Sequence, residues 1–455
     1  MKTKILFLLL VFILSKTSLT GQNNLLPIDS LYLSKIDDFY KNAIEFKDKA
    51  WLGMELSPVC IFRINGPAFL YNHPNPPETL KKIGDNIYQG TQAELQLFGA
   101  TQVEINGVLT AIVDYGLPNY SSPEEVFAEL FHETHHVYQR NSISGINFDN
   151  PVTLLFYPEN YKNDALKIAE QKLLYRLCFC NDEKEFKELL MQINSIRQKR
   201  ETIIGNEYLD YEKDVESMEG PAFYCHLLYY QEYANVNEAL KKNYIEKEFF
   251  GILNTPYYGR EHLRYRHLAS GMAMCFILDK YKKDWKQEYY TSGMKLYDFF
   301  ISKFEVEKLD FDDTEIEYAI SKYHTQLIVE NHIKNLDEFQ NQKGVKVILT
   351  FKNTPQFRSF NPMNAEAIND STVLHTNLLS LKGDNDNELF ITNWSVITHY
   401  TGQIWSVNTI IVFVPEEDIR LTDNKQFEIK TENILINWGG AVKSKNENEI
   451  VFICD

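Results

Sequence analysis

Residues 122–138 of the chain read SPEEVFAELFHETHHVY. The beginning carries three helix-start signals: Ser122 suits the N-cap, Pro123 the first helical position, and Glu125 closes a capping box. Apolar residues then recur at helical spacing, namely Val126, Phe127, Leu130, Phe131, Val137 and Tyr138. The pattern predicts a helix that is mostly buried.

The same helix carries the motif H-E-x-x-H at residues 132–136. His132 and His136 are four positions apart, so both rings project from one face and can bind one Zn²⁺ at about 2.0–2.1 Å each. Glu133 lies where its carboxylate can reach a water on the metal rather than the metal itself. As ordinary core residues, the two histidines and the glutamate would each need a polar partner in an apolar setting, which is costly.

A third ligand must come from elsewhere in the chain. In metzincin metallopeptidases the motif continues with Gly at 139 and a third histidine ligand at 142. The chain has Gln139 and Ser142 there, so this class is excluded. Glu219 is the preferred candidate because Gly220 and Ala222 follow it, and small residues let a second helix approach the first closely.

Two alternatives for the third ligand stay open. Glu216 lies one helical turn before Glu219, and Glu159 lies in a turn-like setting closer to the motif. Pro221 is expected to disturb the helix that presents Glu219. We expect residues 137–218 to form a helical insertion that folds back, so that a helix over 211–230 lies against the helix over 122–140.

The segments at 132–136 and 219–224 resemble those of gluzincin metallopeptidases, in which a Glu-Gly-x-Ala-type segment carries the third zinc ligand. The likeness is greatest to bacterial zinc-dependent peptidases with a long insertion between the two motifs. The resemblance implies a Zn²⁺ ion held by His132, His136 and Glu219. It further implies a peptidase that uses a metal-activated water, with Glu133 as general base.

Gluzincins often place a Tyr or His that stabilises the oxyanion downstream of the third ligand. Tyr265 and His267 follow a Pro- and Gly-marked helix entry in that region, and the resemblance makes them candidates for this catalytic role. The competing interpretation is a packed aromatic helix. A function of a different class, a non-catalytic exported binding or surface protein with a zincin-like fold, also stays open, although such a protein would not need Glu133.

The first 21 residues have the pattern of a signal peptide. Lys2 and Lys4 precede ten apolar residues at 5–14, too few to span a bilayer, and a polar segment and small residues follow. We therefore expect an exported protein, periplasmic or extracellular, with no membrane span after signal removal. The net charge of −17 disfavours nucleic acid and anionic membranes as partners. The resemblance to peptidases implies a peptide or protein substrate.

The expected fold class is α+β. A zincin-like catalytic domain over residues 22–340 would be mainly helical with a small edge-strand sheet, and a β-rich, sandwich-like domain would cover 345–455. A hairpin is expected over 102–115 with its turn at Asn106-Gly107. The resemblance to zincin-like folds implies that one of its strands is the edge strand beside the metal. Helices are expected over 29–46, 164–177, 182–204, 211–230, 236–253, 261–281 and 289–304. C-terminal strands are expected over 345–351, 388–392, 395–400, 404–414, 427–431, 434–438 and 449–453.

Overall fold

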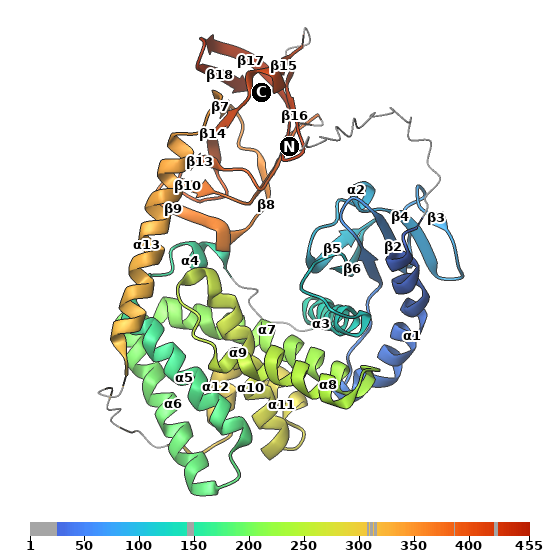
Figure 1. Ribbon diagram of the computed structural model, residues 1–455, viewed down its shortest axis with the longest axis vertical. Helices are drawn as coiled ribbons and strands as arrows, with labels where there is room; N and C mark the ends of the chain where they lie inside the picture. Colours follow the sequence, from blue (N-terminus) through green and yellow to red (C-terminus); the bar gives the residue numbers. More distant parts are fainter. Residues whose placement is uncertain are drawn as a thin grey trace, which may run out of the picture.

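The computed structural model describes residues 25–142, 150–306, 309, 313, 316–385, 387–422 and 426–455. The expected signal peptide at residues 1–21 lies outside this part of the chain. A small N-terminal sheet, a helical middle and a C-terminal region of strands follow one another, which confirms the α+β class (Figure 1). None of the described helices has the length and apolar character needed to cross a membrane.

The N-terminal part is a six-stranded sheet with helices on one face. Its strand order is β3-β4-β2-β1-β6-β5, with β1 and β6 parallel and the other pairs antiparallel. Val59 and Ile61 of β1 join the core beneath the helices, whereas Cys60 and Phe62 point into a smaller core on the opposite face. The elements are α1 (Pro27–Ala50), β1 (Val59–Phe62), β2 (Pro67–Tyr71), β3 (Lys81–Lys82), β4 (Ile87–Thr91), α2 (Gln92–Leu95), β5 (Ala100–Ile105), β6 (Val108–Asp114) and α3 (Pro123–Ser142).

The predicted hairpin is confirmed as β5 and β6. Asn106 and Gly107 at its turn have φ of 44° and 81°, the positive values that a two-residue hairpin turn requires. β5 is the terminal strand of the sheet order, so one of its edges is not covered by another described strand. This edge strand lies against α3.

The middle of the chain is helical, and α7 lies at its centre. As predicted, α7 packs against α3; it also packs against α10 and α12 (Figure 1). The helices are α4 (Pro151–Leu155), α5 (Tyr161–Phe179), α6 (Glu183–Ile204), α7 (Asn206–Tyr233), α8 (Glu238–Ile245), the π-helical η1 (Glu246–Phe250), α9 (Gly251–Asn254), η2 (Arg260–His262), α10 (Leu263–Tyr281), α11 (Trp285–Ser292), α12 (Leu296–Ser302) and α13 (Tyr318–Gln340).

Two helix predictions need correction. Pro221 does not interrupt α7, which runs through it and is held on both sides by α3 and α10. The helix expected over 289–304 is split instead into α11 and α12. Gly293 between them has φ of 66°, a left-handed conformation that ends a helix.

The C-terminal strands follow one continuous order instead of forming two separate sheets. Among the described residues the sheet has twelve strands, ten of them in this order, while β16 pairs with β17 beside it and β15 pairs with β16. The two halves share one hydrophobic core. β17 joins the halves because it continues through Gly439-Gly440, beyond the end expected at residue 438. Gly440 lies so close to Ile453 that a side chain would not fit. The strands are β7 (Val345–Phe351), β8 (Gln356–Phe360), β9 (Ala365–Asn369), β10 (Thr372–His375), β11 (Leu378–Lys382), β12 (Glu388–Thr392), β13 (Val396–Tyr400), β14 (Val407–Val414), β15 (Ile419–Leu421), β16 (Gln426–Lys430), β17 (Ile434–Lys445) and β18 (Glu449–Cys454).

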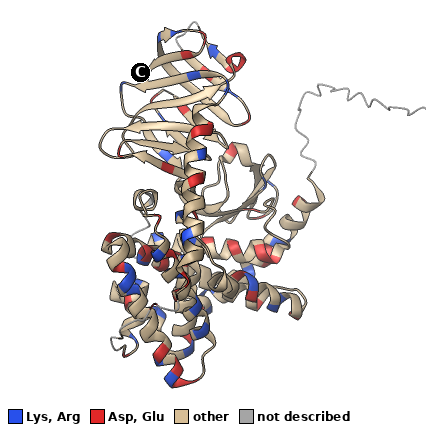
Figure 2. Ribbon diagram, turned by 60° about the vertical axis from the view of Figure 1, so that its left-hand side comes forward, with Lys and Arg blue, Asp and Glu red and all other residues tan. Residues whose placement is uncertain are grey.

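The strand region is anchored on the helices. Leu155 of α4 packs in one buried cluster with Ala365, Val373 and Tyr400, and Arg260 donates from Nη2 to the Ala365 carbonyl at 2.7 Å. Acidic and basic residues are interspersed along the helices and are fewer on the strands (Figure 2). The buried junction fixes the strand region beside the cavity described below.

Candidate metal centre

The helix that carries the H-E-x-x-H motif begins as its sequence predicts. The amide of Glu125 donates to Ser122 Oγ at 3.4 Å, and the Glu125 carboxylate accepts from the Ser121 amide at 2.7 Å. The first bond satisfies an amide that the first helical turn leaves free, and the second ties Glu125 to Ser121, the residue before Ser122. From this fixed start, two turns of α3 bring His132 and His136 to the face that meets α7.

Three buried side chains converge between α3 and α7. Nε2 of His132 and Nε2 of His136 are 2.9 Å apart, and Glu219 Oε2 lies 3.5 Å from the first and 3.2 Å from the second. Two ligand atoms of a tetrahedral zinc ion at about 2.0–2.1 Å are about 3.3–3.4 Å apart. The three atoms therefore already form a triangle of the size that zinc requires, and two histidines with one glutamate are a donor set of catalytic zinc sites.

Both oxygens of Glu219 are engaged. Oε2 faces the histidines, and Oε1 accepts a hydrogen bond from Arg264 Nη2 at 2.6 Å. Burial alone would raise the pKa of Glu219, but the charges of His136 and Arg264 hold that pKa well below its ordinary value. Glu219 is thus a carboxylate with one oxygen directed at the histidines, the form in which it can bind a metal.

Gln139 fixes the orientation of the His136 ring. Its amide nitrogen donates to the Met218 carbonyl at 3.0 Å, and its amide oxygen lies 2.8 Å from His136 Nδ1. Because that oxygen can only accept, Nδ1 keeps a proton, and when the His136 ring is neutral its Nε2 has the lone pair that a metal can bind.

Negative charge surrounds His132. Burial by itself would lower the pKa of His132, but the hydrogen bond to Glu219 and the charges of Glu129, Glu133 and Glu219 raise it to about 9. The position attracts a cation, and a metal ion would displace a proton there.

Glu133 is buried beside the two histidines, and β5 holds it. Gln102 of β5 donates from Nε2 to Glu133 Oε2 at 2.6 Å. Burial raises the pKa of Glu133 above its ordinary value, even though the histidines act in the opposite direction. A carboxylate with a raised pKa, held through one oxygen only among the hydrogen bonds of the described residues, suits a general base.

The structure brings Glu219 to the histidines, and it places the two alternative glutamates elsewhere. Glu216 is an ion-pair partner of Arg197 and of Lys167, at 3.4 Å from the lysine. Glu159 accepts from the Arg260 amide at 3.2 Å. Among the described residues, neither belongs to a group that could hold a metal with His132 and His136.

Tyr265 and His267 lie in different places. Tyr265 is 52% exposed and lines the cavity next to the histidines. His267 is fully buried, 3.3 Å from Glu216 through Nδ1, and does not line that cavity. The structure therefore brings only Tyr265 to the place that the sequence suggests for both.

Gly220 serves a different contact from the one expected. A Cβ at Gly220 would lie 2.6 Å from the Cα of Gly271 in α10, so this glycine allows α7 to approach α10 and not α3. The reason is helical geometry: successive residues point about 100° apart, and Glu219 already faces α3.

A cavity of about 820 Å³ opens over the three converging side chains. Residues 98–102, leading into and along β5, and residues 360–363 at the end of β8 both line it. His132, Glu133, His136 and Glu219 lie on its surface. The volume is that of a site for a ligand of several residues or a small molecule.

Several residues of the site were not predicted from the sequence. Gln139 could have been found, because it lies three positions after His136 on the same helix. Gln102 and Arg264 come from a strand and from a distant helix, and no local pattern marks either of them.

Comparison of the chain with protein-family models, with curated proteins and with solved structures finds no match.

Proposed function

We propose that the chain is a zinc-dependent peptidase of the gluzincin type, with His132, His136 and Glu219 as the metal ligands. The observation that carries the proposal is the buried triangle of two nitrogens and one oxygen, with sides of 2.9, 3.2 and 3.5 Å, at the wall of the cavity. Bound zinc lowers the pKa of a water molecule towards about 7 and polarises a carbonyl group.

Glu133 is the proposed general base. Its Oε2 is held by Gln102, which leaves Oε1 to take the proton from the attacking water and to return it to the leaving amine. Since Gln102 belongs to β5, the strand that lines the cavity also sets the direction of the catalytic carboxylate. Tyr265, exposed at the cavity wall, is the proposed oxyanion donor.

A peptide is the proposed substrate because β5 offers an edge. The strand ends its sheet, and residues 98–102 face the cavity, so an extended backbone can add to it by main-chain hydrogen bonds. A sheet with an edge strand next to the motif helix is the arrangement expected of a zincin-like fold. Residues 360–363 also line the cavity, which gives the strand region a part in enclosing the substrate.

The test of the proposed activity is hydrolysis of a mixed peptide library, with and without a zinc chelator. We expect cleavage that the chelator abolishes and that Glu133→Gln abolishes while zinc stays bound. Glu124→Gln is the matched control, because Glu124 lies on the same helix but pairs with Lys35 at 3.2 Å. A zinc-loaded protein that cleaves no peptide would support the non-catalytic binding protein instead, and full activity of Glu133→Gln would refute the general-base role.

Export is a further part of the proposal and rests on residues 1–21. Expression of the full chain in a bacterial host should give a protein outside the cytoplasm that begins near residue 22. N-terminal sequencing of the exported fraction measures this, and an intact Met1 in that fraction would contradict signal-peptide cleavage.

A further inference from the structure

His132 presents its two ring nitrogens to two different surroundings. Nε2 faces His136 and Glu219, as described above. Nδ1 is buried and has no hydrogen-bond partner among the residues that the structure describes. A histidine that binds a metal through one nitrogen almost always donates from the other, so this Nδ1–H needs an acceptor.

His136 shows how the chain meets the same need. Its Nδ1 is held by the side-chain oxygen of Gln139 at 2.8 Å, three positions along the same helix. The corresponding position for His132, three residues in the other direction, is Glu129. Side chains at i and i−3 lie on one helix face, so this carboxylate is within reach of the ring.

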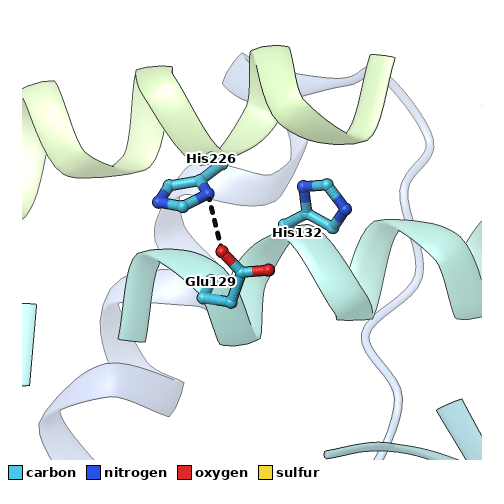
Figure 3. A group of neighbouring side chains, drawn as sticks. All are labelled: Glu129, His132 and His226. Carbon is cyan, nitrogen blue, oxygen red and sulfur yellow. Dashed lines mark ion pairs between the residues drawn. The ribbon is translucent and has the colours of Figure 1, made fainter. Parts of the chain in front are cut away.

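Glu129 is itself paired with a residue of α7. Its Oε2 lies 3.3 Å from Nδ1 of His226, which is buried, whereas the Glu129 side chain is 23% exposed. One ligand-type atom from each of Glu129, His132 and His226 falls in a group whose members all lie within 4.8 Å of one another. In Figure 3 the carboxylate of Glu129 lies below the two rings, and one nitrogen of His132 turns towards the side of His226.

We propose that Glu129 is a positioning residue that accepts the Nδ1–H of His132 and that His226 holds this carboxylate in place. The inference rests on the proposed zinc site. The ligand atoms of Glu129 and His132 in this group are at most 4.8 Å apart. A rotation of the Glu129 side chain closes a gap of that size, or one water molecule bridges it. His226 follows Glu219 by seven residues on α7, so the pair ties together the two helices that supply the metal ligands.

A second metal ion in the same group is the competing arrangement. It would have to bind Nδ1 of His132 while Nε2 binds the first ion, and a ring with both nitrogens bound has lost both of its protons. Positioning needs no such loss, because the neutral ring binds through Nε2 and donates from Nδ1.

The experiment is a zinc titration of the full chain in competition with a chromogenic chelator, together with metal content per chain. We expect one zinc per wild-type chain and a 10–100-fold weaker affinity in Glu129→Ala, with partial rescue in Glu129→Gln, whose amide oxygen can still accept. His226→Leu should weaken affinity in the same direction. Glu124→Gln should bind zinc like the wild type, and the thermal unfolding of metal-free Glu129→Gln should match that of the metal-free wild type.

The outcomes separate this inference from the proposed function. A wild-type chain without zinc overturns both. One zinc per chain with unchanged affinity in Glu129→Ala overturns the positioning role and leaves the metal site standing. If the wild-type chain binds two zinc ions and His226→Leu binds only one, the positioning role is overturned and Glu129, His132 and His226 form a second metal site.

Discussion

Replacing Gly220 by alanine tests the packing that carries the third ligand. The added Cβ would lie 2.6 Å from both Cα and the carbonyl carbon of Gly271. Carbon atoms at rest lie about 3.5–4.0 Å apart, so α7 and α10 would have to separate by about 1 Å at this point. The obstacle is backbone on both sides, and no side chain can rotate out of the way.

The sign of the change in the free energy of unfolding decides between helix propensity and overpacking. Elsewhere in a helix, Gly→Ala stabilises by about 1 kcal/mol through helix propensity. Overpacking in a close-packed interior costs about 1–3 kcal/mol, and at a contact between two backbones we expect the upper end of that range. Gly220→Ala should therefore destabilise the chain by about 1–2 kcal/mol.

Zinc affinity should fall in the same variant. Glu219 directly precedes Gly220 in the chain. Because metal–ligand distances tolerate a change of only about 0.2 Å, a shift of about 1 Å in α7 moves the Glu219 oxygen out of binding distance from the metal. We expect a loss of about tenfold or more, comparable to the removal of a group that orients a ligand.

Urea unfolding of the metal-free chain and zinc competition measure the two effects. Gly271→Ala should behave like Gly220→Ala because it adds a Cβ to the same crossing. Gln231→Ala, at an exposed position of the same helix, is the control and should change stability by less than about 0.5 kcal/mol. A more stable Gly220→Ala with unchanged zinc affinity would refute the close crossing of α7 and α10.

Three other outcomes follow from named contacts. Gln139→Ala should weaken zinc binding by about 10–100-fold because His136 loses the acceptor for Nδ1, and equal affinity in a competition titration would contradict that role. Gln102→Leu should lower the turnover of a cleaved peptide without loss of zinc, and unchanged turnover would show that Glu133 does not need this bond. Burial would raise the pKa values of Glu212 and Glu216, but their buried cationic neighbours hold both well below the ordinary value. The stability that they contribute is therefore present above the ordinary carboxyl pKa of about 4.3 and is lost as pH falls through the folded values. In urea unfolding, Glu216→Gln should cost about 3–5 kcal/mol at pH 7 and about 1–2 kcal/mol less at pH 3, and the same cost at both pH values would contradict this.

Local sequence signals predicted the motif helix well. The cap at Ser122, the apolar spacing and the position of the two histidines depend only on residues within a few helical turns, and α3 begins at Pro123 as expected. The same holds for the hairpin at Asn106-Gly107 and for β7 and β12, whose observed bounds match the expected ones. Such elements have turn residues or clear alternation at their ends.

The parts that sequence reasoning missed depend on distant residues. Of the six-stranded N-terminal sheet only the β5–β6 hairpin was predicted, because β1 to β4 are short runs and β3 is only two residues long. Lys167, Arg197 and Glu216 come from three helices, and only the fold shows that they pair with one another. Glu216 could therefore compete with Glu219 in the sequence, although it is fully committed to its basic neighbours in the structure.

Gly220 was correctly predicted to allow close helix packing, but the predicted partner helix was wrong. A small residue next to Glu219 did indicate close helix packing, but the partner is Gly271 in α10. The sequence contains both glycines and gives no sign that they meet, since they are 51 positions apart and the contact depends on the path of the chain between them.

The most direct test of the central claim is a crystal structure of the zinc-loaded protein with anomalous scattering recorded at the zinc edge. We expect a single strong peak between α3 and α7, about 2.0–2.2 Å from Nε2 of His132, Nε2 of His136 and an oxygen of Glu219, with one position open towards the cavity. A protein that takes up no zinc, or a peak held by other residues while Glu219 points away from the histidines, would contradict it.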